Sequence, residues 1–131
     1  MKPALHRAYT RTRYEAGGVV VRIGQRSTAM DALLDAHRVR SAGFVTAWNP
    51  FSRRMPRGWN ERMLGRLREA ARRRRRVLAE GWGSGGGWAE RHLLVAGDAR
   101  WLARLARRFR QNALVVVARG RPARLQMAKA Q

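Results

Sequence analysis

The sequence contains no cysteine, so disulfide bonds and thiolate metal sites are excluded. It also has no apolar run that approaches the roughly 18 residues of a membrane-spanning helix. Residues 1–13 lack the apolar stretch of a secretory signal. We therefore expect a cytoplasmic protein. Its 131 residues are enough for one domain with a buried core, which we place at 1–131.

Acidic residues are scarce in this chain. It has 8 aspartates and glutamates against 29 lysines and arginines, which gives a formal net charge of +21. A positive field of this size attracts polyanions such as nucleic acid, anionic membranes or acidic proteins. Nucleic acid is the first partner to consider, and the alternative is a solvated basic surface without a particular partner.

Arginines concentrate in two predicted helices. The candidate nucleic-acid surface consists of Arg72, Arg73, Arg74, Arg75, Arg76, Arg104, Arg107 and Arg108. Basic residues near a helix C-terminus also suit the helix dipole, so the run 72–76 could instead be a solvated helix end. No helix-turn-helix, zinc-finger or RNP motif accompanies the arginines. Trp48, Trp82 and Trp88 could stack on bases if they are exposed, although tryptophans are more often in the core.

The stretch LAEGWGSGGGWAE, residues 78–90, contains Gly81, Gly83 and Gly86 in the spacing G-x-G-x-x-G. This spacing marks a dinucleotide-binding loop only when a helix follows it. Here residues 93–95 are Leu-Leu-Val, which suits a buried strand, and no Lys-Ser or Lys-Thr pair of a Walker loop is present. The pattern favours a β-hairpin over a phosphate-binding loop.

The same stretch reads nearly the same in both directions. This symmetry predicts that Trp82 faces Trp88 across a flexible five-residue loop, and that Glu80 faces Glu90. Two facing carboxylates must meet arginines, bind a cation or share a proton. Arginine bridging is the expected solution. Two carboxylates and His92 are few ligands for a metal ion, so no metal site and no cofactor are expected.

Periodicity and turn residues predict an α+β fold, a mixed β-sheet with about three packed helices, in the order ββαβαββαββ. Strands are expected at 9–16, 19–23, 42–48, 113–118 and 122–127, with the hairpin at 77–95. Helices are expected at 27–39, 59–76 and 98–110.

A polar and basic loop follows the predicted central strand 42–48. In open α/β sheets ligands bind at such carboxyl ends, and the free N–H groups at the next helix start favour anions. Three arginines of this loop could clamp a phosphate or carboxylate. The loop contributes Thr46, Asn49, Ser52, Arg53, Arg54, Arg57 and Asn60 to a candidate ligand or anion site. The alternative is structural, since Asn and Ser side chains also stabilise proline-containing loops and helix starts.

Glu90 joins this candidate site. It is two residues from His92, so both side chains point to one face of their strand. A carboxylate without a partner is costly to bury, so we expect an arginine or other donors near the loop 49–60 to hold it. A relay of Ser52, His92 and Glu90 is conceivable, but no nucleophile-elbow motif supports it.

Four motifs in order along the chain, Y-x-x-T-x-Y, T-A-W-N-P-F-S, W-A-E and R-Q-N-A, resemble the bacterial domain of unknown function number 3293. The resemblance covers nearly the whole chain and implies a shared fold and a polar set, without an activity. The implied positions are Tyr9, Thr12, Tyr14, Thr46, Asn49, Pro50, Ser52, Asn60, Glu90, Gln111 and Ala113. Gln111 therefore joins the candidate ligand site. His92 departs from the small residue of the family pattern.

The sequence thus indicates a small basic protein that binds a phosphate-bearing partner, nucleic acid first, without catalysis. The alternative is an enzyme, or a small-molecule or nucleotide-binding protein, built on Asn49, Ser52, Asn60 and Glu90. A nucleic-acid binder should place its arginines in one exposed stripe. A small-ligand protein should gather the polar set into one pocket.

Overall fold

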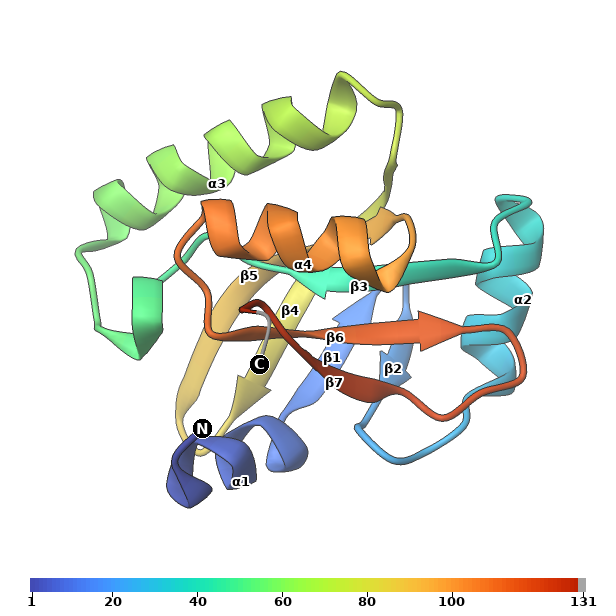
Figure 1. Ribbon diagram of the computed structural model, residues 1–131, viewed down its shortest axis with the longest axis horizontal. Coiled ribbons are helices and arrows are strands. Elements are labelled where there is room, and N and C mark those ends of the chain that lie inside the picture. The colour runs from blue at the N-terminus through green and yellow to red at the C-terminus, as the bar shows by residue number, and fades with distance from the viewer. Residues whose placement is uncertain (130–131) are drawn as a thin grey trace.

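The computed structural model describes residues 1–129, so the last two residues of the predicted domain lie outside the described part. This part contains four α-helices and seven strands (Figure 1). The elements are α1 (Pro3–Arg11), β1 (Arg13–Ala16), β2 (Val19–Val21), α2 (Thr28–Ala36), β3 (Ser41–Val45), a 3₁₀ turn (Pro50–Ser52), α3 (Arg57–Arg72), β4 (Val77–Gly85), β5 (Trp88–Ala96), α4 (Ala99–Arg108), β6 (Ala113–Ala118) and β7 (Arg124–Met127). The α+β class is confirmed, whereas the prediction of three helices misses α1.

The seven strands form one sheet in the order β2-β1-β4-β5-β3-β6-β7. Every pairing between these strands is antiparallel, so the prediction of a mixed sheet is wrong. The helical connections through α3 and α4 do run between parallel strands, from β3 to β4 and from β5 to β6. Each connection skips one position, and an antiparallel strand fills the gap.

The sheet curls until its two edges meet. Ile23, just after β2, forms a bridge with Ala123, just before β7. Two backbone hydrogen bonds support this bridge, from the Gly24 N–H to the Ala123 carbonyl (2.7 Å) and from the Ala123 N–H to the Gln25 carbonyl (3.1 Å). The curl gives the sheet a concave and a convex face.

Helices cover the two faces differently. On one face α3 and α4 pack together on the sheet, with Leu67 and Leu102 among the buried residues (Figure 1). On the other face α2 closes one end of the concave side with Leu34. Alternation along β5 turns Leu93 toward α3 and α4 and Leu94 toward the concave side. None of the described helices is long and apolar enough to cross a bilayer.

Helix α1 replaces the first half of the predicted strand 9–16. Pro3 stands in the first helical turn, where its missing N–H is not needed. The helix ends at Arg11, and the next residue, Thr12, caps it with a hydroxyl that donates to the Ala8 carbonyl (2.6 Å). The alternation in YTRTRYEA imitates a strand, but the β-pairing begins only at Arg13.

The β4–β5 hairpin is present, but its predicted register is wrong. Gly86 and Gly87, with φ of 51° and 82°, form a two-residue turn instead of a five-residue loop. Two adjacent residues with positive φ are typical of the tight turn that matches strand twist, and glycine adopts them easily. Trp82 therefore pairs with Arg91, and Trp88 with Gly85.

The first two glycines of the G-x-G-x-x-G spacing have packing roles. A Cβ at Gly81 would lie 1.7 Å from the Glu15 carbonyl oxygen of β1. A Cβ at Gly83 would lie 2.7 Å from His92 Cε1. Gly81 thus permits the close approach of β1, and Gly83 makes room for the His92 ring.

Candidate functional site

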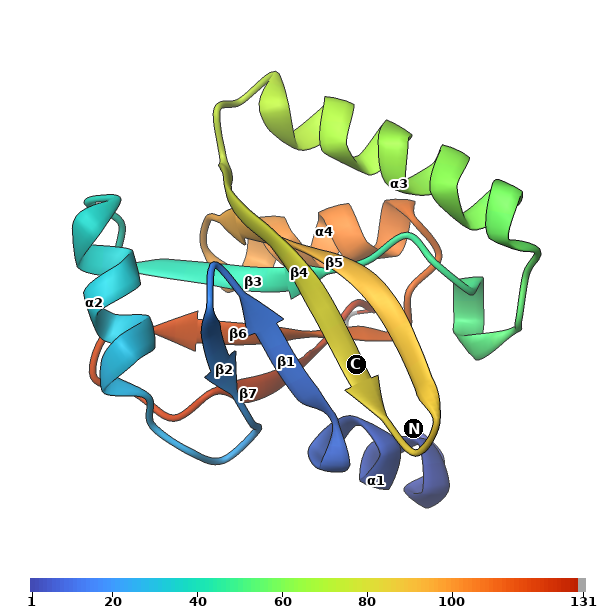
Figure 2. The same cartoon turned by 180° about the vertical axis from the view of Figure 1, so that it is seen from behind.

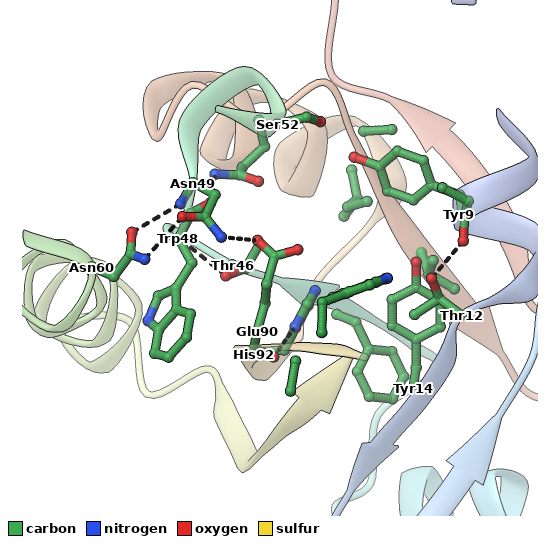
Figure 3. Close-up of a pocket in the computed structure, with 18 of the residues that line it drawn as sticks. Tyr9, Thr12, Tyr14, Thr46, Trp48, Asn49, Ser52, Asn60, Glu90 and His92 are labelled. Carbon is green, nitrogen blue, oxygen red and sulfur yellow. Dashed lines mark hydrogen bonds between the residues drawn. The ribbon is translucent and has the colours of Figure 1, made fainter. Parts of the chain in front are cut away.

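A pocket of about 590 Å³ opens on the concave face of the sheet (Figure 3). Its floor includes Tyr14, Phe44 and Val115 from three strands. Helix α1 and the tip of the β4–β5 hairpin border it on one side, and the segment 46–57 borders it on another. The volume lies in the range of sites for small organic molecules.

The pocket gathers most of the candidate ligand site. It is lined by Thr46, Asn49, Ser52, Arg54, Arg57, Asn60, Glu90 and Gln111. Arg53 is exposed and does not line the pocket. These residues come from three separate segments of the chain, 46–60, Glu90 and Gln111, and the curl of the sheet brings them together.

Asn49 organises the loop beside the pocket. Its Oδ1 accepts hydrogen bonds from the Met55 N–H and from Asn60 Nδ2, both at 2.9 Å. Its own N–H donates to Asn60 Oδ1 (2.9 Å). Its side-chain Nδ2 donates to Glu90 Oε2 (3.2 Å). Asn49 therefore joins the loop, the start of α3 and strand β5.

The loop backbone is strained next to this network. Asn49, Phe51 and Ser52 all have positive φ, at 46°, 51° and 63°. Asn tolerates this region better than most residues, but a bulky residue such as Phe51 is unusual there. Strain of this kind concentrates at functional sites, where the surrounding structure imposes it.

Glu90 is the central ionisable group of the pocket. The Asn49 contact agrees with the expectation that a donor from the 49–60 loop holds this carboxylate. Within residues 1–129 no arginine bridges it, so that version of the prediction is wrong. Burial raises the pKa of the Glu90 carboxyl, and the hydrogen bond from Asn49 offsets part of this rise.

Glu80 carries the arginine bridge instead. It pairs with Leu93, not with Glu90, and so faces α3. Arg68 of α3 binds it through Nε and Nη2 (3.0 and 2.9 Å), and Arg91 Nη2 adds a contact at 3.0 Å. The hydrogen bond from Arg68 lowers the pKa of Glu80.

The two glutamates, Glu80 and Glu90, thus lie on opposite faces of the sheet and cannot share a metal ion or a proton. No three His, Asp or Glu side chains of residues 1–129 form a group that could hold a metal.

His92 lies beside Glu90 on the pocket face. Its Nδ1 is 3.0 Å from the Glu90 carbonyl oxygen. Because a carbonyl oxygen only accepts, Nδ1 carries the proton and Nε2 keeps a lone pair. Burial lowers the pKa of His92 to about 4, so the ring is neutral at neutral pH. The ring meets Tyr14 edge to face, with centroids 5.6 Å apart.

The Ser52–His92–Glu90 relay is not formed. Ser52 is exposed, and its Oγ accepts a hydrogen bond from Asn112 Nδ2 (3.3 Å). Among the described residues, no hydrogen bond joins Ser52 to His92. Ser52 therefore borders the pocket without an activating base.

Two tyrosines also face Glu90 (Figure 3). Burial, with the nearby charge of Glu90, raises the pKa of Tyr9 to about 12. Burial likewise raises the pKa of Tyr14. Both hydroxyls are therefore neutral at neutral pH. The predicted site omits these tyrosines although the family resemblance points to them, because the strand predicted at 9–16 gave no reason to place Tyr9 in a pocket.

The candidate nucleic-acid arginines lie away from the pocket. Arg72, Arg73, Arg74, Arg75, Arg104, Arg107 and Arg108 are exposed, and none lines the pocket. Arg76 differs because its guanidinium stacks on Trp101, 4.5 Å from the ring centroid. Helix α3 ends at Arg72, and Arg75 with φ of 53° belongs to the turn that follows. Trp82 and Trp88 are partly exposed, and Arg91 covers one face of Trp82.

Glu90 should give stability a pH dependence. The folded protein holds this pKa above its ordinary value of 4.5, so folding favours the protonated carboxyl. The contribution of this group to stability is therefore greatest below pH 4.5 and declines as the pH rises through the folded pKa. Glu90→Gln should remove this decline, so the variant should exceed the wild type most at high pH. Thermal melts from about pH 4 to about pH 8 check this, and an equal loss of stability at every pH would contradict it.

Comparison with known protein families matches residues 45–114, more than half of the chain, to the family described as "Protein of unknown function (DUF3293)". The match spans the strained loop, α3, the hairpin and α4, and it confirms the resemblance in the three motifs within it, whereas the motif at 9–14 lies outside the matched residues. No curated protein and no solved structure matches the chain significantly. The chain therefore belongs to the DUF3293 family.

Proposed function

We propose that this protein binds a small molecule that carries an anionic group, a phosphate or a carboxylate, in the pocket around Glu90. One observation carries the proposal. Polar residues from separate segments of the chain converge on a single cavity of about 590 Å³. If each of these residues only stabilised its own loop or helix, they would not need to surround a shared open cavity.

The basic end of the pocket supports an anionic group on the ligand. Arg54 and Arg57 line the pocket and are otherwise exposed. Neither forms an ion pair with a carboxylate of residues 1–129. Helix α3 begins at Arg57, so unpaired backbone N–H groups add to the positive potential there.

Ser52 lines the pocket without a hydrogen bond to His92, and this lack of an activated nucleophile favours binding over catalysis. Glu90 is positioned by Asn49, and aromatic rings of Tyr14 and Trp48 form part of the walls. A shielded carboxyl with a raised pKa could also act as a general acid or base, which is the enzymatic alternative. Turnover that disappears in Glu90→Gln while ligand binding persists would favour that alternative.

The experiment is a thermal-shift screen of the full chain. The panel contains nucleoside monophosphates, sugar phosphates and amino acids, with inorganic phosphate as a minimal anion. We expect at least one organic member to raise the melting temperature of the wild type. The same compound should have little effect on the double variant Arg54→Gln/Arg57→Gln.

Arg53 provides the matched control. It belongs to the same exposed loop but does not line the pocket. Arg53→Gln should respond to the compound like the wild type, because it changes the net charge without changing the pocket. A panel without any stabilising organic compound, or a response that Arg53→Gln removes as fully as the double variant, would overturn the proposal.

Nucleic-acid binding is a second candidate, favoured by the exposed arginines of α3 and α4. These helices lie side by side on the same face of the sheet (Figure 1), and their arginines Arg72, Arg104, Arg107 and Arg108 are exposed. Fluorescence anisotropy with duplex DNA at two salt concentrations tests this candidate. Each neutralised phosphate should add about 0.9 to the slope of log affinity against log salt. No binding at low salt would exclude it.

A further inference from the structure

Several hydrogen-bond donors inside the pocket are already used by the fold. The Thr46 hydroxyl donates to the Arg91 carbonyl (2.6 Å), and the Thr12 hydroxyl donates to the Ala8 carbonyl (2.6 Å). Gln111 Nε2 donates to the carbonyls of Trp48 and Phe109, at 3.1 and 3.2 Å. These donors are therefore satisfied by the fold and are not offered to a ligand.

The side-chain donors of Asn60 and Trp48 are also engaged or turned away. Asn60 Nδ2 donates to Asn49 Oδ1 and to the Met55 carbonyl. The indole Nε1 of Trp48 is buried without a partner, and it lies on the side of the ring away from Glu90 (Figure 3). Apart from the hydroxyls of Tyr9 and Tyr14, which can donate or accept, these donors are thus not available for recognition.

Two acceptors, in contrast, remain free at the inner end. Asn49 occupies Glu90 Oε2, whereas Glu90 Oε1 accepts no hydrogen bond from residues 1–129. His92 donates through Nδ1, so its Nε2 lone pair also lacks a donor within the described chain. Both side chains project from the same face of β5 toward the tyrosines (Figure 3).

The position of His92 is built into the fold. Its ring is buried against Tyr14, and it occupies the space that the missing side chain of Gly83 leaves. Because burial keeps this ring neutral, Nε2 stays an acceptor at neutral pH. Glu90 and His92 therefore present acceptors to the pocket, while Arg54 and Arg57 in its lining present cations.

We infer that the ligand places a planar group with two neighbouring N–H donors against Glu90 and His92, as a guanidinium or the edge of a guanine-type base does. This inference rests on the proposed function, which supplies the anionic end at Arg54 and Arg57. A planar group suits a pocket lined by aromatic rings, and paired N–H donors match a carboxylate with a free oxygen. The ligand class is thus an anion-bearing guanidine or aminated heterocycle.

Isothermal titration calorimetry distinguishes a ligand with a guanine-type base from a ligand with a guanidinium group. The probes are guanosine monophosphate and 4-guanidinobutanoate. Inosine monophosphate, which lacks the amino donor, and butanoate, which lacks the guanidinium, are their controls. We expect one of the two probes to bind the wild type, and its control to bind at least about tenfold more weakly. Binding of the nucleotide identifies a base, and binding of the guanidino acid identifies a guanidinium.

Variants test the two acceptors. Glu90→Gln replaces one acceptor with a donor, and His92→Phe keeps a ring against Tyr14 but removes the lone pair. Each should weaken binding of the probe by about tenfold to hundredfold. Glu61→Gln removes an exposed carboxylate of α3 outside the pocket and should leave the affinity unchanged. Melting curves confirm that each variant is folded.

The outcomes distinguish this inference from the proposed function. If neither probe binds the wild type, or if Glu90→Gln binds the probe as tightly as the wild type, the inference is overturned. If a compound of the screen still requires Arg54 and Arg57 in that case, the proposed function stands without it. If no organic compound of the screen binds, both fail.

Discussion

Replacing Gly81 with alanine is expected to lower the free energy of unfolding by about 3 kcal/mol or more. The new Cβ would lie 1.7 Å from the Glu15 carbonyl oxygen and 2.8 Å from Ala16 Cα, both on the backbone of β1. A backbone neighbour cannot rotate away as a side chain can, so β1 must move away from β4. That movement would disturb Tyr14 and the floor of the pocket. Urea unfolding, followed by circular dichroism, measures the change.

Gly65 provides the control for this substitution. It lies within α3, and a Cβ there would meet no atom within 4 Å. Gly65→Ala should therefore raise the unfolding free energy by up to about 1 kcal/mol, because alanine favours a helix. If the two variants changed stability by the same amount and in the same direction, the close approach of β1 to Gly81 would be refuted.

Replacing Asn49 with alanine is expected to cost about 3 kcal/mol of stability. The change leaves the Met55 N–H and Asn60 Nδ2 without their acceptor and removes the donor of Glu90. Alanine also tolerates the positive φ of this position less well than asparagine. Thermal and urea unfolding measure the cost, and ligand binding should fall as well because Glu90 loses its positioning contact.

Asn112 is the matched control for the Asn49 variant. Its Nδ2 makes one long hydrogen bond, 3.3 Å to Ser52 Oγ, in an exposed setting. Asn112→Ala should therefore change the unfolding free energy by less than about 0.5 kcal/mol. Equal costs for the two asparagines would show that the Asn49 network does not hold the loop.

The sequence predicts elements whose signals are local. The apolar stripes of α2, α3 and α4 and the run of buried residues in β6 place these elements within a few residues of their observed bounds. Local patterns do not predict the N-terminal helix, because the residues around its C-terminus, from Tyr9 to Arg13, alternate as in a strand. The start of β1 is set by its pairing with β4, a strand about 70 residues further along the chain, which pairs Arg13 with Ser84.

The register of the hairpin shows a second limit. The mirrored sequence around Trp82 and Trp88 suggests an aromatic pair, but the turn at Gly86 and Gly87 sets the pairing. Register depends on turn geometry, and several glycines in succession leave the position of the turn open in the sequence. The predicted register therefore places Glu80 opposite Glu90, whereas in the structure Glu80 pairs with Leu93 and lies on the other face of the sheet.

The candidate site was easier to predict than its shape. Because a buried carboxylate without a partner is costly, the sequence predicts a donor to Glu90 near the 49–60 loop, and Asn49 is that donor. The contribution of α1 and the free acceptor of His92 depend on the curl of the sheet. That curl arises from contacts between distant strands, which local patterns do not reveal.

The central claim is that the cavity around Glu90 is the ligand site. The most direct measurement is a crystal structure of the protein with the screen compound that stabilises it most. We predict density for the compound inside the cavity, with its anionic group at Arg54 and Arg57 and its other end at Glu90. A compound bound instead to the exposed arginines of α3 and α4, above an empty cavity, would contradict the account.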